Sequence, residues 1–337
     1  MLTLGIESTC DETGVALVRD GKIIEVNRLS SSVDLQKKFG GVIPEVAARE
    51  QVKVIIPLIS DALSGISLNA IDAIAVSFGP GLVGSLLVGV ETAKALAYTL
   101  GKPLIAVNHL EGHIYANWLE SNPKFPLIGL IVSGGHTDLI LMRRQGDFKL
   151  LGSTLDDACG EAFDKVAKFL ELGYPGGPEI EVEAQKYKVP NRNDEAESLL
   201  NPMFPSPMIG SSNFNFSFSG LKTAVVNYVS KNNIQLEAKN VSRIAYYFQD
   251  SVVRVLVNKT LKAAKKYRVE SIVVGGGVAA NTRLRDELLK KVDRDYKVYF
   301  PEKKFSVDNG AMIAAAAFYK NIPVDPLKLF ADPNLHF

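Results

Sequence analysis

Cysteine, tryptophan and histidine are scarce in this chain of 337 residues, which contains two, one and four of them respectively. The two cysteines, Cys10 and Cys159, stand far apart, and the sequence has no CxxC pair. A small secreted domain held together by disulfides and a cysteine-ligated zinc cluster are therefore both excluded. We expect both thiols to be reduced.

An excess of charge of either sign is also absent, since 38 basic residues face 37 acidic ones and the net charge is +1. No global field draws the chain to a polyanion, so any nucleic-acid site must be local. The longest apolar helical stretch, from Leu82 to Val90, is far shorter than the ~20 residues of a membrane span. The first ten residues lack the basic start and apolar run of a secretory signal. We expect a soluble, cytoplasmic protein without membrane contact.

One pattern of strands and helices occurs twice along the chain. LTLGIESTC leads into the hairpin GVALVRDGKIIEVNRLSSS, and FPLIGLIVSGGHTDLILMRRQGDFKLLGST repeats this layout. The segments AIDAIAVSFGPG and RVESIVVGGGVAANTRLRDELLKK are each a strand that runs into a glycine-rich loop and a helix, and each is followed by a third strand. This repeat predicts a duplicated α/β unit with a mixed, mainly parallel sheet in each copy.

The duplication predicts two lobes with a cleft between them, a layout similar to actin-like and sugar-kinase ATPases. We expect the first lobe to span residues 1–110, completed by a C-terminal helix at about 309–325. The second should span 111–308 and carry an insertion at about 153–271. Ligands bind beyond the carboxyl ends of strands in such sheets. The loops at 8–12, 133–136 and 275–281 should therefore converge on the cleft.

The sharpest local signal is NHLEGH, in which His109 and His113 stand four residues apart after a strand. On a helix this spacing places both imidazoles on one face, about 5 to 6 Å apart, which suits a shared metal ion. Glu111 lies two residues from each histidine, so it points away from their face and cannot act as the base of a zinc protease. The alternative is that the two histidines form a surface or core pair on a helix and bind no metal.

Other candidate ligands are weaker by themselves. Asp308, in FSVDNGAM, is the best-placed third metal ligand, although such a residue is more often a helix N-cap. Asn281 after the GGG loop could bond a nucleotide or cap its helix. Among the acidic residues of DDACGEAFDKVAKFL, most should form a solvated face, but one carboxylate could grip ribose hydroxyls, with Glu181 as a second. The turn at 175–178 would let the backbone approach a base.

These segments also carry a family resemblance. Nine motifs occur in order: IESTCDETGVALV, GPGLVGSLLVG, NHLEGH, IVSGGHT, DDACGEAFDKVAK, YPGGP, FSFSGLKT, GGGVAAN and DNGAMIA. Through these motifs the chain resembles, from residue 4 to residue 315, the bacterial branch of the TsaD family, the tRNA N6-adenosine threonylcarbamoyltransferases. It implies a duplicated actin-like ATPase (ribonuclease H-like) fold. It also implies transfer of threonylcarbamoyl from threonylcarbamoyl-adenylate to N6 of adenosine 37 in tRNAs reading ANN codons, with release of AMP.

The resemblance further assigns residues and partners. His109, His113 and Asp308 would ligate one Fe²⁺ or Zn²⁺, and Asp11 or Glu12 would assist loss of the amine proton. The adenylate, or ATP, ADP or AMP in its place, would be held by Ile131, Val132, Ser133, Gly134, Gly135, Asp164, Gly177, Glu181 and Asn281. Expected partners are tRNA, an inactive TsaB-like paralogue bound through the first lobe, and a TsaE-like P-loop ATPase.

Two other classes of function remain open on sequence alone. An actin-like ATPase or sugar kinase would need only the nucleotide cleft, and it would leave the histidine pair without a role. A scaffold or regulatory protein with a vestigial cleft would show no dependence on a metal ion. The histidine pair is the feature that distinguishes these two hypotheses from a metal-dependent transferase.

Overall fold

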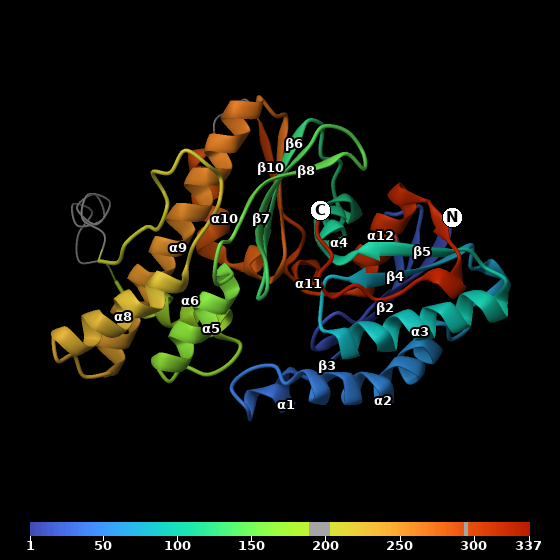
Figure 1. The fold of residues 1–337 in the computed structure, drawn as a ribbon, viewed down its shortest axis with the longest axis horizontal. Helices are drawn as coiled ribbons and strands as arrows, with labels where there is room; N and C mark the ends of the chain where they lie inside the picture. The colour runs from blue at the N-terminus through green and yellow to red at the C-terminus, as the bar shows by residue number, and fades with distance from the viewer. Residues whose placement is uncertain (189–202, 293–295) are drawn as a thin grey trace.

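The computed structural model describes residues 1–188, 203–292 and 296–337, and it contains two mixed β-sheets with helices on their faces (Figure 1). The first sheet has the order β11-β5-β4-β1-β2-β3. Its strands are β1 (Leu2–Glu7), β2 (Glu12–Arg19), β3 (Ile23–Ser31), β4 (Ala73–Gly79), β5 (Leu104–Asn108) and β11 (Pro323–Val324). Strand β1 pairs antiparallel with β2 and parallel with β4.

The second sheet repeats this plan with the order β10-β9-β6-β7-β8. Its strands are β6 (Leu127–Val132), β7 (Thr137–Met142), β8 (Phe148–Ser153), β9 (Ser271–Gly275) and β10 (Lys297–Tyr299). Strand β6 pairs antiparallel with β7 and parallel with β9, as β1 does with β2 and β4. The predicted duplication of a hairpin followed by alternating strands and helices is confirmed.

The helices form layers around the two sheets. Helices α2 (Pro44–Ala62) and α3 (Val83–Leu100) cover the outer face of the first sheet, and α4 (His109–Tyr115) and α12 (Gly310–Lys320) lie between the sheets (Figure 1). The outer face of the second sheet is covered by α5 (Cys159–Phe169), α6 (Gly176–Lys186), α8 (Ser219–Lys231), α9 (Ala238–Tyr267) and α10 (Thr282–Lys291). The described residues also contain two short helices, α1 (Val33–Lys37) and α11 (Lys303–Ser306).

Helix α12 joins the end of the chain to the first sheet. A side chain at Gly5 in β1 would overlap the carbonyl oxygen of Gly310, so strand and helix touch through their backbones. The run of alanines at 314–317 is fully buried and allows the same close approach along the helix. This contact fixes the position of Asp308, which directly precedes the N-cap of α12.

The structure differs from the sequence expectation at the YPGGP segment, which was predicted as a turn. Residue 175 is instead the N-cap of α6, and the helix begins at Gly176. Proline is tolerated in the first turn of a helix because its missing N–H would have no intrahelical acceptor there. Pro178 therefore does not prevent the helix.

Across the described ranges no helix is long and apolar enough to span a membrane. The polar stretch at 191–197 of the predicted insertion lies outside the described residues.

Candidate metal and nucleotide site

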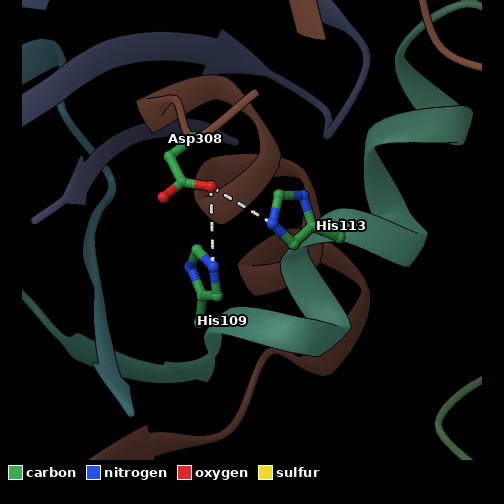
Figure 2. A group of neighbouring side chains, drawn as sticks. All are labelled: His109, His113 and Asp308. Carbon is green, nitrogen blue, oxygen red and sulfur yellow. Dashed lines mark ion pairs between the residues drawn. The ribbon is translucent and has the colours of Figure 1, made fainter. Parts of the chain in front are cut away.

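Three potential metal ligands meet where α4 and α12 lie side by side. His109 and His113 come from the first turns of α4, and their ring centroids are 4.6 Å apart. Oδ1 of Asp308 lies 3.2 Å from Nε2 of His113 and 3.6 Å from Nε2 of His109 (Figure 2). One potential ligand atom from each of the three residues lies within 4.8 Å of the others. The predicted one-face arrangement of the two imidazoles is confirmed.

Asp308 is free to act as a ligand because its neighbour caps the helix. Asn309 is the N-cap of α12, and its Oδ1 accepts a hydrogen bond from the Met312 amide at 3.0 Å. The helix-cap interpretation of Asp308 is therefore wrong. Burial by itself would raise the pKa of the Asp308 carboxyl, but His109 and His113 outweigh it and lower the pKa to about 2.

The three residues suit a metal ion because of their donor atoms and because some of these buried atoms lack hydrogen bonds. Nδ1 of His113 is buried without a hydrogen-bond partner among the described residues, and its Nε2 faces Oδ1 of Asp308 at 3.2 Å without a well-formed hydrogen bond. Buried polar atoms in this condition are rare unless a ligand or water satisfies them. Burial lowers the pKa of His109, but Glu7 and Asp308 outweigh it and raise the pKa to about 9, so the site favours positive charge. Two imidazole nitrogens and a carboxylate oxygen form a donor set suited to iron or zinc.

Two glycine loops lie at the ends of adjacent parallel strands, β6 and β9. At Gly134 and Gly135 a side chain would meet nothing within 4 Å, so the backbone there is open to a ligand. Gly276 has a φ of 91° and packs against Val132. A side chain at Gly275 would touch the backbone of His113, so the second loop adjoins the candidate metal site.

The remaining predicted nucleotide ligands lie on α5, α6 and the start of α10. Asp164 accepts a hydrogen bond from the Gly176 amide at 2.7 Å, and burial raises its pKa to about 6. Glu181 accepts from the Thr282 amide at 3.0 Å, which links α6 to α10. Gly177 lies in the first turn of α6, where a side chain would meet nothing within 4 Å.

Asn281 caps α10, as one of its two sequence interpretations predicted. Its Oδ1 accepts from the Leu284 amide at 3.0 Å, and its Nδ2 donates to Gln249 at 2.8 Å. Ile131 and Val132 are fully buried in β6, so their side chains do not reach a ligand. Gln249 was not indicated by any sequence motif, because it lies in the middle of the long helix α9.

Asp11 ends the loop between β1 and β2, and Glu12 is the first residue of β2. Burial raises the pKa of Glu12 well above its usual value, and the charges of Asp308 and Asp11 add to this effect. The charge of Asp11 also contributes, after burial, to the raised pKa of Tyr174 in the segment before α6. The 8–12 loop is thus electrostatically coupled both to the candidate metal ligands and to the other lobe.

Sequence reasoning missed Glu7, which lies beside His109. Its side chain is fully buried, and Oε2 is 3.0 Å from Nδ1 of His109. The signal was available, since a glutamate ends the otherwise apolar strand LTLGIE and a buried carboxylate requires partners.

Comparison with known proteins shows the family to which the chain is similar. The family model described as TsaD, tRNA N6-adenosine threonylcarbamoyltransferase, matches residues 24–315. A protein of that name from Syntrophomonas wolfei is 50% identical over 340 residues, covering 99% of this chain and 97% of its own length. Another from Thermosipho africanus is 48% identical over 343 residues and covers 99% of both chains.

Solved structures of low sequence identity share the fold. HypF of T. kodakarensis superposes with a TM-score of 0.62 at 14% identity, covering 95% of this chain and 47% of that one. Component A of the (R)-2-hydroxyglutaryl-CoA dehydratase from Acidaminococcus fermentans gives 0.55 at 16% identity, covering 95% and 98%. With the two related sheets, these matches confirm the predicted two-lobed, duplicated actin-like ATPase (ribonuclease H-like) fold.

Proposed function

Because the chain belongs to the tRNA N6-adenosine threonylcarbamoyltransferase family, we propose that it transfers threonylcarbamoyl from threonylcarbamoyl-adenylate to N6 of adenosine 37 in tRNAs reading ANN codons. The N6 amine attacks the carbamoyl carbon, the bond from this carbon to the phosphate oxygen breaks, and AMP leaves. The observation that carries the proposal is the meeting of His109, His113 and Asp308 beside open glycine loops. An ATPase or sugar kinase would leave these three ligands without a role.

The three ligands would hold one Fe²⁺ or Zn²⁺. The buried Nε2 of His113, which faces Asp308 without a well-formed hydrogen bond, and the low pKa of Asp308 support this assignment, because both fit a bound cation. When bound, such an ion acts as a Lewis acid that polarises a carbonyl oxygen of the substrate. The chain's own contribution is to hold the three side chains on two packed helices, α4 and α12.

The adenylate lies against the glycine loop that follows β6. Backbone amides in such a loop suit phosphate, and the open positions at Gly134 and Gly135 support this placement. Ile131, Val132 and Ser133 lead the backbone to that loop, and Gly177 leaves space beside it. Asp164 and Glu181 accept hydrogen bonds from ribose hydroxyls, and Asn281 contacts the nucleotide from the start of α10. ATP, ADP or AMP would occupy the same place.

Asp11 or Glu12 accepts the proton that N6 loses. A carboxylate with a raised pKa is a stronger base than one in water, and partial burial raises the pKa of Glu12. Asp11 is almost fully buried beside it, and both charges act on the thiol of Cys10 between β1 and β2. Each of the two carboxylates therefore remains a candidate for this role.

The enzyme acts with partners in the cytoplasm, where its tRNA substrate is found. Helix α3 leaves Val83 and Leu87 exposed on the first lobe, which supports contact there with a TsaB-like paralogue. A TsaE-like P-loop ATPase would complete the assembly. The lobes themselves comprise residues 1–110 with the helix at 309–325, and residues 111–308 with the insertion at 153–271.

The assignment is tested by product formation. The chain is incubated with the paralogue, the ATPase, unmodified tRNA and threonylcarbamoyl-adenylate, and the digested RNA is analysed for threonylcarbamoyladenosine by mass spectrometry. Product is expected from the wild type and from His336→Ala, and not from His113→Ala. Absence of product with every partner set would refute the transferase, and equal product from His113→Ala would refute the role of the metal site.

A further inference from the structure

Glu7 ends strand β1 with a fully buried carboxylate, and each of its oxygens has a partner. Oε1 accepts a hydrogen bond from the Thr9 amide at 2.7 Å, and Oε2 lies 3.0 Å from Nδ1 of His109. The Thr9 bond holds the carboxylate in place, so its second oxygen is aimed at the imidazole. None of the roles described above uses this residue.

We infer that Glu7 is a positioning residue that fixes His109 in the tautomer and orientation needed to bind a metal ion through Nε2; this inference rests on the proposed metal site. An ionised carboxylate can only accept hydrogen bonds, so Nδ1 of His109 must carry the hydrogen. Nε2, the nitrogen facing Asp308 at 3.6 Å, then keeps its lone pair for the metal. Carboxylates behind metal-binding histidines act in this way in many proteins.

Thr9 shows why the carboxylate is needed. Its hydroxyl Oγ1 lies 3.2 Å from the same Nδ1 of His109, and a hydroxyl can donate as well as accept. If Thr9 donated to Nδ1, the hydrogen of a neutral ring would be on Nε2, and the metal ligand would be lost. Glu7 removes this alternative, because it requires a hydrogen on Nδ1.

The two histidines are held differently. Nδ1 of His113 has no hydrogen-bond partner among the described residues, and its fully buried ring is placed by packing. The effect of Glu7 on metal binding should therefore pass through His109 alone. This gives a test that a general structural role of Glu7 would not satisfy.

The first test is the zinc affinity of the full-length Glu7→Gln variant, measured by competition with a chromogenic chelator. Glutamine keeps the shape but offers one acceptor oxygen to two donors, so we expect a loss of about 10- to 100-fold, the usual effect of removing such a partner. Glu183→Gln is the matched control, because Glu183 is also a buried carboxylate and bonds to Ser242 away from the site. It should bind zinc like the wild type.

A double-mutant cycle then separates positioning from stability. In the His109→Ala background, Glu7→Gln should cause no further loss of zinc affinity. In the zinc-loaded wild type, the ¹⁵N–¹H spectrum of labelled histidine should show a slowly exchanging Nδ1–H of His109, and this signal should shift or vanish in Glu7→Gln. Wild-type affinity of Glu7→Gln, or an equal loss in both backgrounds, would overturn the inference.

Two further outcomes are distinguishable. If Glu7→Gln does not fold, Thr9→Val replaces it: this variant removes only the competing hydroxyl and should bind zinc at least as tightly as the wild type, whereas a tenfold loss would overturn the inference. If His109→Ala itself binds zinc like the wild type, the proposed metal site fails. If His109→Ala binds zinc more weakly than the wild type while Glu7→Gln binds it equally well, only the proposed role of Glu7 is refuted.

Discussion

Nε2 of His113 lies 3.2 Å from Oδ1 of Asp308, although α4 lies in the first half of the sequence and Asp308 stands near the end of the chain. The contact exists because α12 packs beside α4 between the two sheets (Figure 1). Asp308 directly precedes the N-cap of α12, so docking of this helix completes the ligand set. Metal binding and the position of α12 should therefore be coupled.

Asp308→Asn should abolish stoichiometric metal binding without unfolding the protein. An amide is a neutral and weaker ligand than a carboxylate, and the helix cap does not depend on this residue because Asn309 supplies it. We expect metal content, measured by plasma mass spectrometry, to fall well below one ion per chain and transferase activity to fall about 100-fold or more, beyond the loss typical of a supporting residue.

Asn309→Ala, at the adjacent position, is the matched control for Asp308→Asn. It removes the cap and should cost about 0.5–2 kcal/mol of stability while leaving all three ligands in place. Metal per folded chain should remain near that of the wild type. Retention of full metal content by Asp308→Asn would show that the carboxylate is not a ligand.

Affinity for adenosine should depend on pH through Asp164. Burial raises the pKa of this carboxyl to about 6, so it is mostly protonated at pH 5 and mostly ionised at pH 7.5. The ionised form accepts hydrogen bonds from ribose hydroxyls more strongly than the protonated form, so affinity should rise by up to about tenfold between these pH values, in line with the ionised fraction. Calorimetry with adenosine avoids the titration of a phosphate. Asp164→Asn should give a weak and flat profile, and an unchanged pH dependence in that variant would contradict the assignment.

Local patterns in the sequence were sufficient for the two sheets and for the histidine pair. Strand periodicity and turn residues predict the hairpins, and the spacing of four places His109 and His113 on one face of a helix. The role of Asp308 could not be decided in this way. Whether it caps α12 depends on which side chain, its own or that of Asn309, bonds the first turn, and only tertiary structure shows this.

Glu7 and the start of α6 escaped prediction for similar reasons. A glutamate at the end of a strand is usually exposed, and its burial here depends on a partner that is distant in sequence, His109. Adjacent prolines and glycines at 175–178 carry a strong turn signal that tertiary packing overrides. The domain boundaries and the choice between Asp11 and Glu12 stay predictions.

Gly5→Ala should be strongly destabilising. The added methyl group would overlap the backbone of Gly310 and Ala314, so α12 would have to move away from β1. Such overpacking costs about 1–3 kcal/mol and more where backbone must shift. Gly134→Ala is the control, because its methyl would meet nothing within 4 Å. Urea unfolding should give near wild-type stability for Gly134→Ala; equal stability of the two variants would contradict the tight contact of β1 with α12.

Leu87→Asp should prevent binding of the TsaB-like paralogue without harming the isolated chain. Leu87 is 45% exposed and Val83 57% exposed on α3, so a charge there meets water in the monomer and stability should change by less than about 0.5 kcal/mol. In a complex the same charge would be buried against an apolar surface without a partner, which costs several kcal/mol and weakens binding by at least a hundredfold. Leu289→Asp on α10, where the leucine is 55% exposed, is the matched control and should leave the complex intact. Size-exclusion chromatography of each variant with the paralogue shows whether the complex forms. A complex that survives Leu87→Asp but dissociates with Leu289→Asp would place the interface on the second lobe.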